Sequence, residues 1–333
     1  MMTTEILLVL LCVAAGVYCS LTSVERGVPY PPTYTGPVIG VLAQTTFGKM
    51  EKFGHSYIAA SYVKYLEMSG AQVIPVMDSL SAEELNRTLH SINGMLIPGG
   101  GQIFPDSKFY RASKFIYDWT VSYNKNQTET QGHFPLWGTC LGFEAMLYAE
   151  AGANETNDIR FKCSAHMANN LTIQEGAQDS RMLKNLDSKL YQAVQTEKLV
   201  YNSHSFCISP DKIEDTDSPL HKNYNLLAVN WDAEGQQYIA LVEHKTLPIF
   251  ASQFHPEKNG FEWTTYEDIP HSKNAVLFMQ YLANFFLDEA RQNKNQFSES
   301  AEFYKRSINN FSPVYTLMAI NSTLETCYFF HEK

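Results

Sequence analysis

Short apolar runs alternate with amphipathic segments through the first half of the chain. The runs are typical of buried strands and lie at residues 38–43, 73–77 and 95–97. In the segment that follows each run, apolar side chains recur every three or four residues. These segments predict helices at residues 55–68, 81–92 and 108–122. The alternation predicts an α/β fold, with a mostly parallel central sheet covered by helices on both faces.

A fourth apolar run, at residues 134–137, leads into the pentapeptide G-T-C-L-G at residues 138–142. Apolar residues from Leu141 onward then predict another helix, so Cys140 lies at a corner between strand and helix. Small flanking residues and a polar centre are the layout of a nucleophile elbow, which exposes its side chain at the carboxyl end of the sheet. A helix N-terminus also favours a thiolate. A free cysteine that only fills a buried space is the alternative.

The pattern is less regular from residue 154 to residue 235, where we expect shorter strands, loops and one helix at 186–194. A late apolar strand at 248–255 ends in His255-Pro256-Glu257, and a strong helix follows at 274–291. A cysteine nucleophile needs a base, for which His255 is suited, and Glu257 lies close enough in the chain to orient its imidazole. A surface histidine beside a solvated glutamate is the alternative.

Three glycines follow the strand at residues 95–97, in Pro98-Gly99-Gly100-Gly101. Such a loop leaves backbone N–H groups free to face a developing oxyanion. A phosphate-binding loop is disfavoured because no G-K-[ST] follows. An ordinary turn remains an alternative.

The composition describes an acidic globular protein of 333 residues, of which 44% are hydrophobic. Its formal net charge of −10 disfavours nucleic acid and anionic membrane surfaces as partners. The apolar residues 6–15 are too few to span a bilayer and predict a signal peptide over residues 1–19. No later stretch is long enough for a membrane anchor. We therefore expect one catalytic domain at residues 20–333, with a C-terminal extension at 295–333.

Six asparagines begin N-x-S/T sequons, which together with a signal peptide predict a glycoprotein of the secretory pathway. They are Asn86, Asn126, Asn154, Asn170, Asn310 and Asn321.

Four of the six cysteines lie beyond the signal peptide: Cys140, Cys163, Cys207 and Cys327. Their spacing fits neither a zinc site nor a dense disulfide framework, and we expect no metal. If Cys140 is a working thiol, the other three can form at most one internal disulfide. The sequence does not say which pair forms it.

The P-G-G loop, the G-x-C-x-G elbow and the late H-P-E, in this order, resemble the class I glutamine amidotransferase-like superfamily. Within it, several stretches are similar to the gamma-glutamyl hydrolase family, and the similarity covers nearly all of the chain after the signal peptide. They are I-A-A-S-Y-V-K-Y-L-E at 58–67, W-G-T-C-L-G-F-E at 137–144, Q-F-H-P-E-K at 253–258, P-H-S-K-N-A-V at 270–276 and F-S-P-V-Y-T at 311–316.

This resemblance implies a cysteine hydrolase that cleaves gamma-glutamyl bonds of folate and antifolate poly-gamma-glutamates through a thioester, without a cofactor. By motif match, Cys140 is the nucleophile, His255 carries the proton and Glu257 orients His255. The N–H groups of Gly100 and Leu141 form the oxyanion hole.

Two further residues match family positions near the substrate. Glu144 could meet the substrate's free amino group, or it could be a first-turn acid that the helix dipole stabilises. His204 is the best match for a histidine near the substrate, although its flanking residues depart from the expected pattern. The resemblance also implies a homodimer located in the lysosome, secreted, or both.

Two other functions remain open at this stage. A glutamine amidotransferase subunit would share the same triad, but it would need a synthetase partner and would release ammonia from glutamine. A secreted glycoprotein that has kept the fold without catalysis would not lose activity on alkylation of one thiol.

Overall fold

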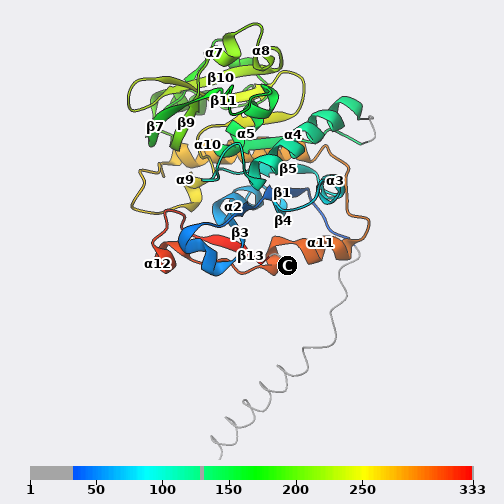
Figure 1. Cartoon of the computed structure of the whole chain (residues 1–333). Helices are drawn as coiled ribbons and strands as arrows, with labels where there is room; N and C mark the ends of the chain where they lie inside the picture. Colours follow the sequence, from blue (N-terminus) through cyan, green and yellow to red (C-terminus); the bar gives the residue numbers. More distant parts are fainter. Residues whose placement is uncertain (1–32, 128–130, 332–333) are drawn as a thin grey trace, which may run out of the picture. The chain divides into compact units, whose positions relative to one another are not determined.

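Five parallel strands end along one edge of the central sheet, and this edge carries the candidate chemistry. The computed structural model describes residues 33–127 and 131–331 (Figure 1). The strand order is β4-β1-β5-β6-β12-β11-β10-β8. The pairs from β4 to β12 are parallel, whereas β11, β10 and β8 pair antiparallel. The expected α/β fold with a mostly parallel sheet is therefore confirmed.

The longest strands of this sheet are the antiparallel β10 and β11, of 8 residues each, whereas the edge strand β8 has 2. The strands of the sheet are β1 (Val38–Leu42), β4 (Gln72–Val76), β5 (Gly94–Ile97), β6 (Leu136–Thr139), β12 (Ile249–Ser252), β11 (Gln237–His244), β10 (Tyr224–Trp231) and β8 (Thr172–Ile173). Two smaller sheets contain β2 (Gln44–Thr45), β3 (Ser56–Ala59) and β13 (Cys327–Phe330), and β7 (Arg160–Asn169) with β9 (Val200–Ile208).

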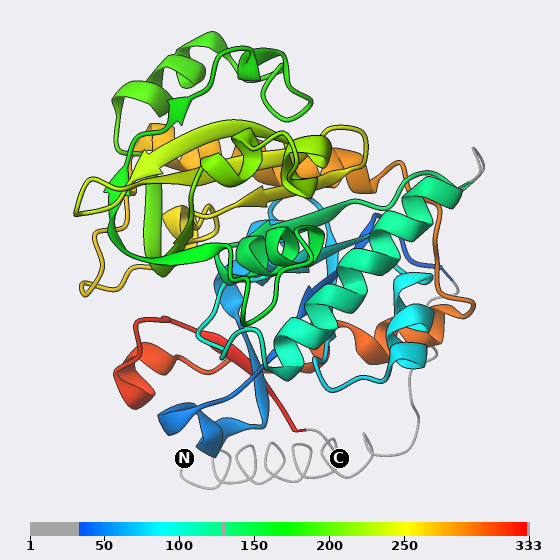
Figure 2. The same ribbon diagram turned by 45° about the horizontal axis from the view of Figure 1, so that its top comes forward.

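Helices cover both faces of the central sheet (Figure 2). On one face, α2 packs against β1, β4 and α10, and on the other α5 packs against β5, β6 and α4. The helices are α2 (Ala60–Glu67), α3 (Ala82–Leu89), α4 (Lys108–Asn126), α5 (Leu141–Glu150), α6 (Ser188–Thr196), α7 (Asp211–Glu214), α8 (Pro219–Asn223), α9 (Lys258–Phe261), α10 (Lys273–Ala290), α11 (Ser300–Arg306) and α12 (Thr316–Ile320). Short 3₁₀ segments lie at Gly48–Phe53, Ala177–Asp179 and Ile308–Asn310.

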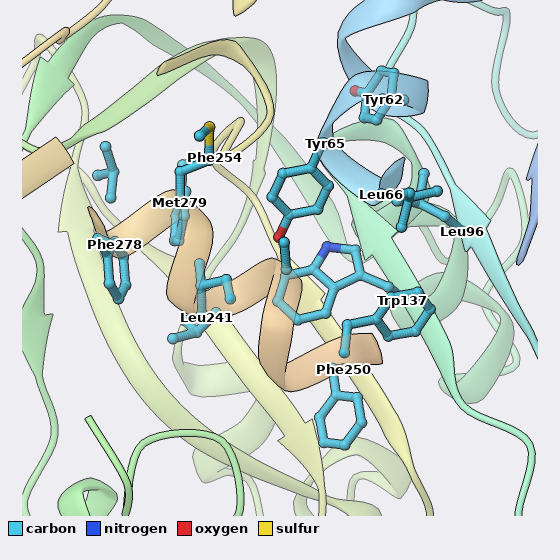
Figure 3. Close-up of a cluster of buried hydrophobic side chains, with 14 of the residues drawn as sticks. Tyr62, Tyr65, Leu66, Leu96, Trp137, Leu241, Phe250, Phe254, Phe278 and Met279 are labelled. Atoms are coloured by element: carbon cyan, nitrogen blue, oxygen red, sulfur yellow. The ribbon is translucent and has the colours of Figure 1, made fainter. Parts of the chain in front are cut away.

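The main hydrophobic cluster lies between the sheet and helices α2 and α10 (Figure 3). Trp137 is fully buried, and its ring meets that of Phe286 edge-on with centroids 6.0 Å apart. Burying a large apolar side chain contributes about 1.5–3 kcal/mol. Because Trp137 immediately precedes the elbow, this packing fixes the strand that carries Cys140.

Local sequence signals explain several helix boundaries. Ser81 and Glu84 form the expected capping box at the start of α3. Ser272 caps α10 by accepting a hydrogen bond from the Ala275 N–H. These polar residues satisfy N–H groups that a helix cannot pair internally.

The prediction of one helix over residues 55–68 was wrong in its first turn. Ser56–Ala59 form strand β3, which pairs antiparallel with β13 near the end of the chain. Cys327 lies opposite Ala59, and Phe330 lies opposite Ser56. The C-terminal extension therefore contributes a strand to the fold.

The predicted signal peptide at residues 1–19 lies outside the described residues. Across residues 33–127 and 131–331, none of the helices is both long enough and apolar enough to cross a bilayer.

Candidate active site

The register of three parallel strands brings three distant loops together. Ile97 of β5 is paired with Gly138 of β6, and Thr139 of β6 is paired with Ser252 of β12. The glycine loop, Cys140 and His255 follow these strand ends directly. The register therefore gathers the three motifs at the carboxyl edge of the sheet.

Cys140 occupies a strained corner between β6 and α5. Its backbone has φ 52° and ψ −108°, a conformation that residues other than glycine rarely adopt. The Cys140 N–H donates to the Ser252 carbonyl at 2.9 Å, which fixes the corner on the neighbouring strand. A Cβ at Gly142 would lie 2.1 Å from the carbonyl oxygen of Ile97, so the turn requires glycine there. This geometry matches the predicted elbow.

His255 and Glu257 form a buried pair beside this corner. The Nδ1 atom of His255 lies 2.7 Å from Oε1 of Glu257. Burial opposes a positive charge on the imidazole, but the Glu257 carboxylate and then Cys140 outweigh it and raise the pKa of His255 to about 10. Among the described atoms, the other ring nitrogen, Nε2, has no hydrogen-bond partner of ordinary length. The imidazole is thus held by one nitrogen and free to act through the other.

Gly99 lies close to both Cys140 and His255. A Cβ on Gly99 would lie 2.7 Å from Cε1 of His255 and 2.9 Å from Cβ of Cys140. Both side chains therefore flank the same stretch of bare backbone, which brings the thiol and the imidazole to one place.

Two polar side chains fix the orientation of the glycine loop. The Gly99 N–H donates to the Tyr62 hydroxyl at 2.8 Å, and Nε2 of Gln44 donates to the Gly99 carbonyl at 2.7 Å. In a trans peptide the carbonyl and the following N–H point in opposite directions, so the Gly100 N–H points away from Gln44. Leu141 is the first residue of α5, and helix geometry gives its N–H no partner within the helix. The oxyanion role of these two N–H groups stays a prediction.

Tyr62 links this loop to the histidine, and the sequence analysis missed it. Its hydroxyl oxygen lies 3.4 Å from Nδ1 of His255. Burial first, and then the Glu257 carboxylate, raise the pKa of Tyr62, so the hydroxyl keeps its proton. The periodicity of α2 placed Tyr62 on an apolar face, and nothing local indicated that its oxygen reaches the site. Gln44, a polar residue just after a buried strand, carried a signal that could have been used.

The side chains surround a cleft of about 200 Å³. Cys140, His255 and Gly100 line it, together with Lys258 and Glu267. Ser203 of β9 also lines it, and its carbonyl accepts a weak hydrogen bond from Sγ of Cys140 at 3.9 Å. The nucleophile candidate therefore opens onto a space that can hold part of a substrate.

Glu144 lies in the first turn of α5 but is not among the residues that line this cleft. Its carboxylate pairs with Arg160 at 3.3 Å and accepts a hydrogen bond from Gln253 at 3.2 Å. Burial raises the pKa of Glu144 to about 7, although Arg160 opposes that shift. Contact between Glu144 and substrate stays a prediction.

His204 of β9 is likewise buried and does not line the cleft. Its Nδ1 lies 3.0 Å from the Phe206 carbonyl, and its ring meets Tyr238 edge-on. Burial, and then the charge of His255, lower the pKa of His204 to about 3, so the ring is neutral. Its substrate role also stays a prediction.

The disulfide that the sequence left open joins Cys163 of β7 to Cys207 of β9. Cys140 and Cys327 are free thiols. The two bonded sulfurs and the His204 imidazole lie within 4.8 Å of one another, a ligand set that could hold a metal ion if both thiols were free. Because the disulfide uses both sulfurs, this cluster is not a metal site in the structure.

All six predicted glycosylation asparagines are exposed. At Asn310, however, the amide nitrogen donates to three backbone carbonyls, those of Tyr304, Lys305 and Ser307. Sugar attachment at any of the six stays a prediction.

Comparison with known proteins places this site in a family. The profile described as peptidase C26 matches residues 37–257, which contain the elbow and the His255–Glu257 pair. The chain belongs to the peptidase C26 family. Members of this family are cysteine-type hydrolases, and the elbow, the histidine and the acid all lie within the matched region.

Named relatives match over almost the full chain. Gamma-glutamyl hydrolase of Mus musculus is 38% identical over 307 residues, covering 92% of this chain and 94% of the relative. The Homo sapiens gamma-glutamyl hydrolase is 35% identical, with 96% and 98% covered. Gamma-glutamyl hydrolase B of Dictyostelium discoideum is 35% identical, with 84% and 79% covered.

Among solved structures, the glutaminase domain of Trypanosoma brucei CTPS with bound acivicin has a TM-score of 0.50 and 16% identity. The match covers 78% of this chain and 95% of that one. At this identity the likeness shows the fold alone, which is that of the class I glutamine amidotransferases.

Proposed function

We propose that this family member hydrolyses gamma-glutamyl bonds in folate and antifolate poly-gamma-glutamates, through a thioester on Cys140. The observation that carries the proposal is the placement of Cys140 and His255 next to Gly99, with Glu257 held against the histidine. The names of the relatives supply the type of bond, a gamma-glutamyl bond, and the folate substrate follows from the family resemblance of the sequence.

In the first half of the reaction, Cys140 reacts as a thiolate while His255 carries the proton, and its Sγ attacks the gamma-carbonyl carbon of a glutamyl unit. The negative charge that develops on the carbonyl oxygen is accepted by the N–H groups of Gly100 and Leu141. His255, protonated through its pairing with Glu257, gives its Nε2 proton to the leaving amine. The carbon–nitrogen bond breaks and a thioester remains.

In the second half, the neutral His255 takes a proton from water, which attacks the thioester carbonyl. The carbon–sulfur bond breaks, the gamma-carboxylate leaves, and the proton on His255 restores the starting state. Glu257 keeps the imidazole in one orientation throughout, because its carboxylate holds Nδ1 and leaves Nε2 to the reaction.

The test is incubation of the purified protein with a folate pentaglutamate, followed by mass spectrometry of the products. Shortened folates with free glutamate or gamma-linked glutamate peptides are expected, and the same products show whether cleavage is internal or terminal. A parallel incubation with glutamine measures ammonia. Ammonia from glutamine with an intact pentaglutamate would favour an amidotransferase subunit and overturn the proposal.

The protein is also proposed to be a glycosylated homodimer of the secretory pathway, delivered to the lysosome or secreted. The apolar N-terminal segment and the six exposed sequons support this location. Removal of N-linked sugars from protein made in a eukaryotic host should lower its apparent molecular mass. Light scattering on the eluting protein should give twice the chain mass, and a monomer would contradict the dimer.

A further inference from the structure

One basic side chain is buried against the cleft that holds Cys140. Among the described residues that line this cleft, Lys258 is the one lysine or arginine, and it is only 4% exposed. It directly follows Glu257 in the chain and opens helix α9. A buried ammonium group is costly unless an anion neutralises it, so the identity of its partner matters.

The anion that neutralises Lys258 is a carboxylate that also lines the cleft. Nζ of Lys258 lies 2.5 Å from Oε2 of Glu267, and the two side chains are 5% and 10% exposed. Nζ also lies over the ring of Tyr201, 5.1 Å from its centroid. Burial, and then the charge of Glu267, raise the pKa of the Tyr201 hydroxyl. A glutamate carboxylate therefore occupies a pocket built from an ammonium group and a phenol.

Glu267 lies in the segment between α9 and α10, which has no regular secondary structure. The base of this segment is fixed, because the Glu262 carboxylate accepts from the Glu325 N–H at 2.7 Å and Nδ1 of His271 lies 2.8 Å from the Asn259 carbonyl. Between these points, Tyr266 is 61% exposed. Tyr266 is also tethered, because its hydroxyl donates to Oδ1 of Asn321 at 2.6 Å. Displacement of Glu267 from Lys258 therefore needs a change of rotamer of the Glu267 side chain and no movement of the segment.

The substrate under the proposed function is a chain of gamma-linked glutamates, in which every unit keeps a free alpha-carboxylate. We propose that Lys258 binds a substrate alpha-carboxylate next to the scissile bond, and that Glu267 occupies this subsite in the unliganded protein until substrate displaces it. This inference rests on the proposed function. One carboxylate replaces another, so Lys258 remains neutralised and the buried charge is never left alone.

The exchange gives the cleft a means of selecting its substrate. A gamma-glutamyl unit with a neutral alpha-carboxamide cannot neutralise Lys258, and it therefore cannot compete with Glu267. Substrates with the free carboxylate should be favoured by about 10–100-fold in kcat/KM, the range expected for one charge-assisted hydrogen bond. Lys258 is thus a specificity-determining residue.

The experiment compares a gamma-glutamyl substrate with two analogues, one carrying an alpha-carboxamide on the acyl side of the scissile bond and one on the leaving side. Each is measured with wild type, Lys258→Gln, Lys258→Arg and Glu267→Gln, with Lys273→Gln as an exposed lysine control. Wild type should discriminate against at least one analogue. Lys258→Gln should abolish that discrimination by losing activity on the carboxylate substrate alone, and Lys258→Arg should restore it.

Glu267→Gln should lower KM for the carboxylate substrate more than it changes kcat, because it removes the internal competitor. If the ion pair has only a structural role, Lys258→Gln should lose activity on all three substrates to the same extent. That result would overturn the inference. Equal kcat/KM of wild type on all three substrates would overturn it too, while leaving the proposed function intact. If wild type cleaves none of them, the proposed function fails first.

Discussion

The Nδ1 atom of His255 lies 2.7 Å from Oε1 of Glu257, and the two side chains are only 8% and 1% exposed. A carboxylate that is this close and buried from solvent binds the imidazolium more strongly than a solvated carboxylate would. The pair therefore sets the pH range over which His255 can donate a proton.

The first prediction concerns the alkaline limit of activity. The pKa of His255 is raised from 6.5 to about 10 against the effect of burial. In Glu257→Gln the negative charge is lost and burial then dominates, so the imidazole should lose its proton at lower pH. We expect the alkaline limb of kcat/KM to move down by about 1–3 pH units.

The measurement is kcat/KM against pH for wild type, Glu257→Gln and Glu299→Gln, an exposed acid on α11's N-cap that serves as control. Activity should extend to mildly acid pH in wild type. A wild-type profile that rises only above neutrality would contradict this account, as would an alkaline limb that stays in place in Glu257→Gln.

The second prediction concerns the elbow. Gly142→Ala would place a Cβ 2.1 Å from the Ile97 carbonyl oxygen, which is backbone and cannot rotate away. We expect it to lower the free energy of unfolding by about 1–3 kcal/mol or more. Gly101→Ala is the matched control, because its Cβ would meet nothing closer than 3.6 Å. Equal urea midpoints for the two variants would show that the turn relaxes around the methyl group.

The third prediction concerns stability at acid pH. Because burial raises the pKa of Glu144 from 4.5 to about 7, the folded protein holds this proton where the unfolded chain has lost it. The resulting stability is fully present below about pH 4.5 and disappears as pH rises to about 7.

The free energy of unfolding of wild type relative to Glu144→Gln should therefore fall by about 1–3 kcal/mol between pH 4.5 and pH 7. Denaturant unfolding at several pH values checks this, with Glu83→Gln, an exposed acid in α3, as control. A difference that stays constant with pH would mean that Arg160 keeps Glu144 ionised throughout.

The fourth prediction concerns the disulfide between Cys163 and Cys207, which closes a sequence separation of 44 residues. Cys163→Ser with Cys207→Ser should lower the free energy of unfolding by about 2–4 kcal/mol. Activity should fall as well, because β9 holds the Ser203 carbonyl against the Cys140 thiol. Peptide mapping after alkylation should label these two cysteines only once the protein is reduced, and their labelling without reductant would show that the bond is absent.

Local patterns predicted much of the site. Two glycines around Cys140 identified the elbow because a tight strand-to-helix turn tolerates little else, and His255 was recognised because it follows a late apolar strand. Both features depend on neighbours within a few residues. The motifs follow neighbouring parallel strands, so the sheet itself brings them to the same edge.

Features that depend on distant partners could not be predicted in the same way. Ser56–Ala59 form a strand because β13 pairs with them, and that partner lies at the far end of the chain. The pairing of Cys163 with Cys207 depends on the register of β7 against β9. Nothing in the residues next to Lys258 indicates that its side chain is buried, and its partners Glu267 and Tyr201 come from other parts of the chain.

The most direct test of the central claim is the turnover rate of Cys140→Ala on a folate pentaglutamate, measured beside wild type and beside Cys327→Ala. Cys327 is the other free thiol within residues 33–127 and 131–331. If Cys140 forms the thioester, its removal should lower kcat by at least about 10³-fold while the unfolding midpoint stays near that of wild type. Cys327→Ala should retain turnover. More than a few per cent of wild-type turnover in Cys140→Ala, from a preparation free of wild-type protein, would contradict the account.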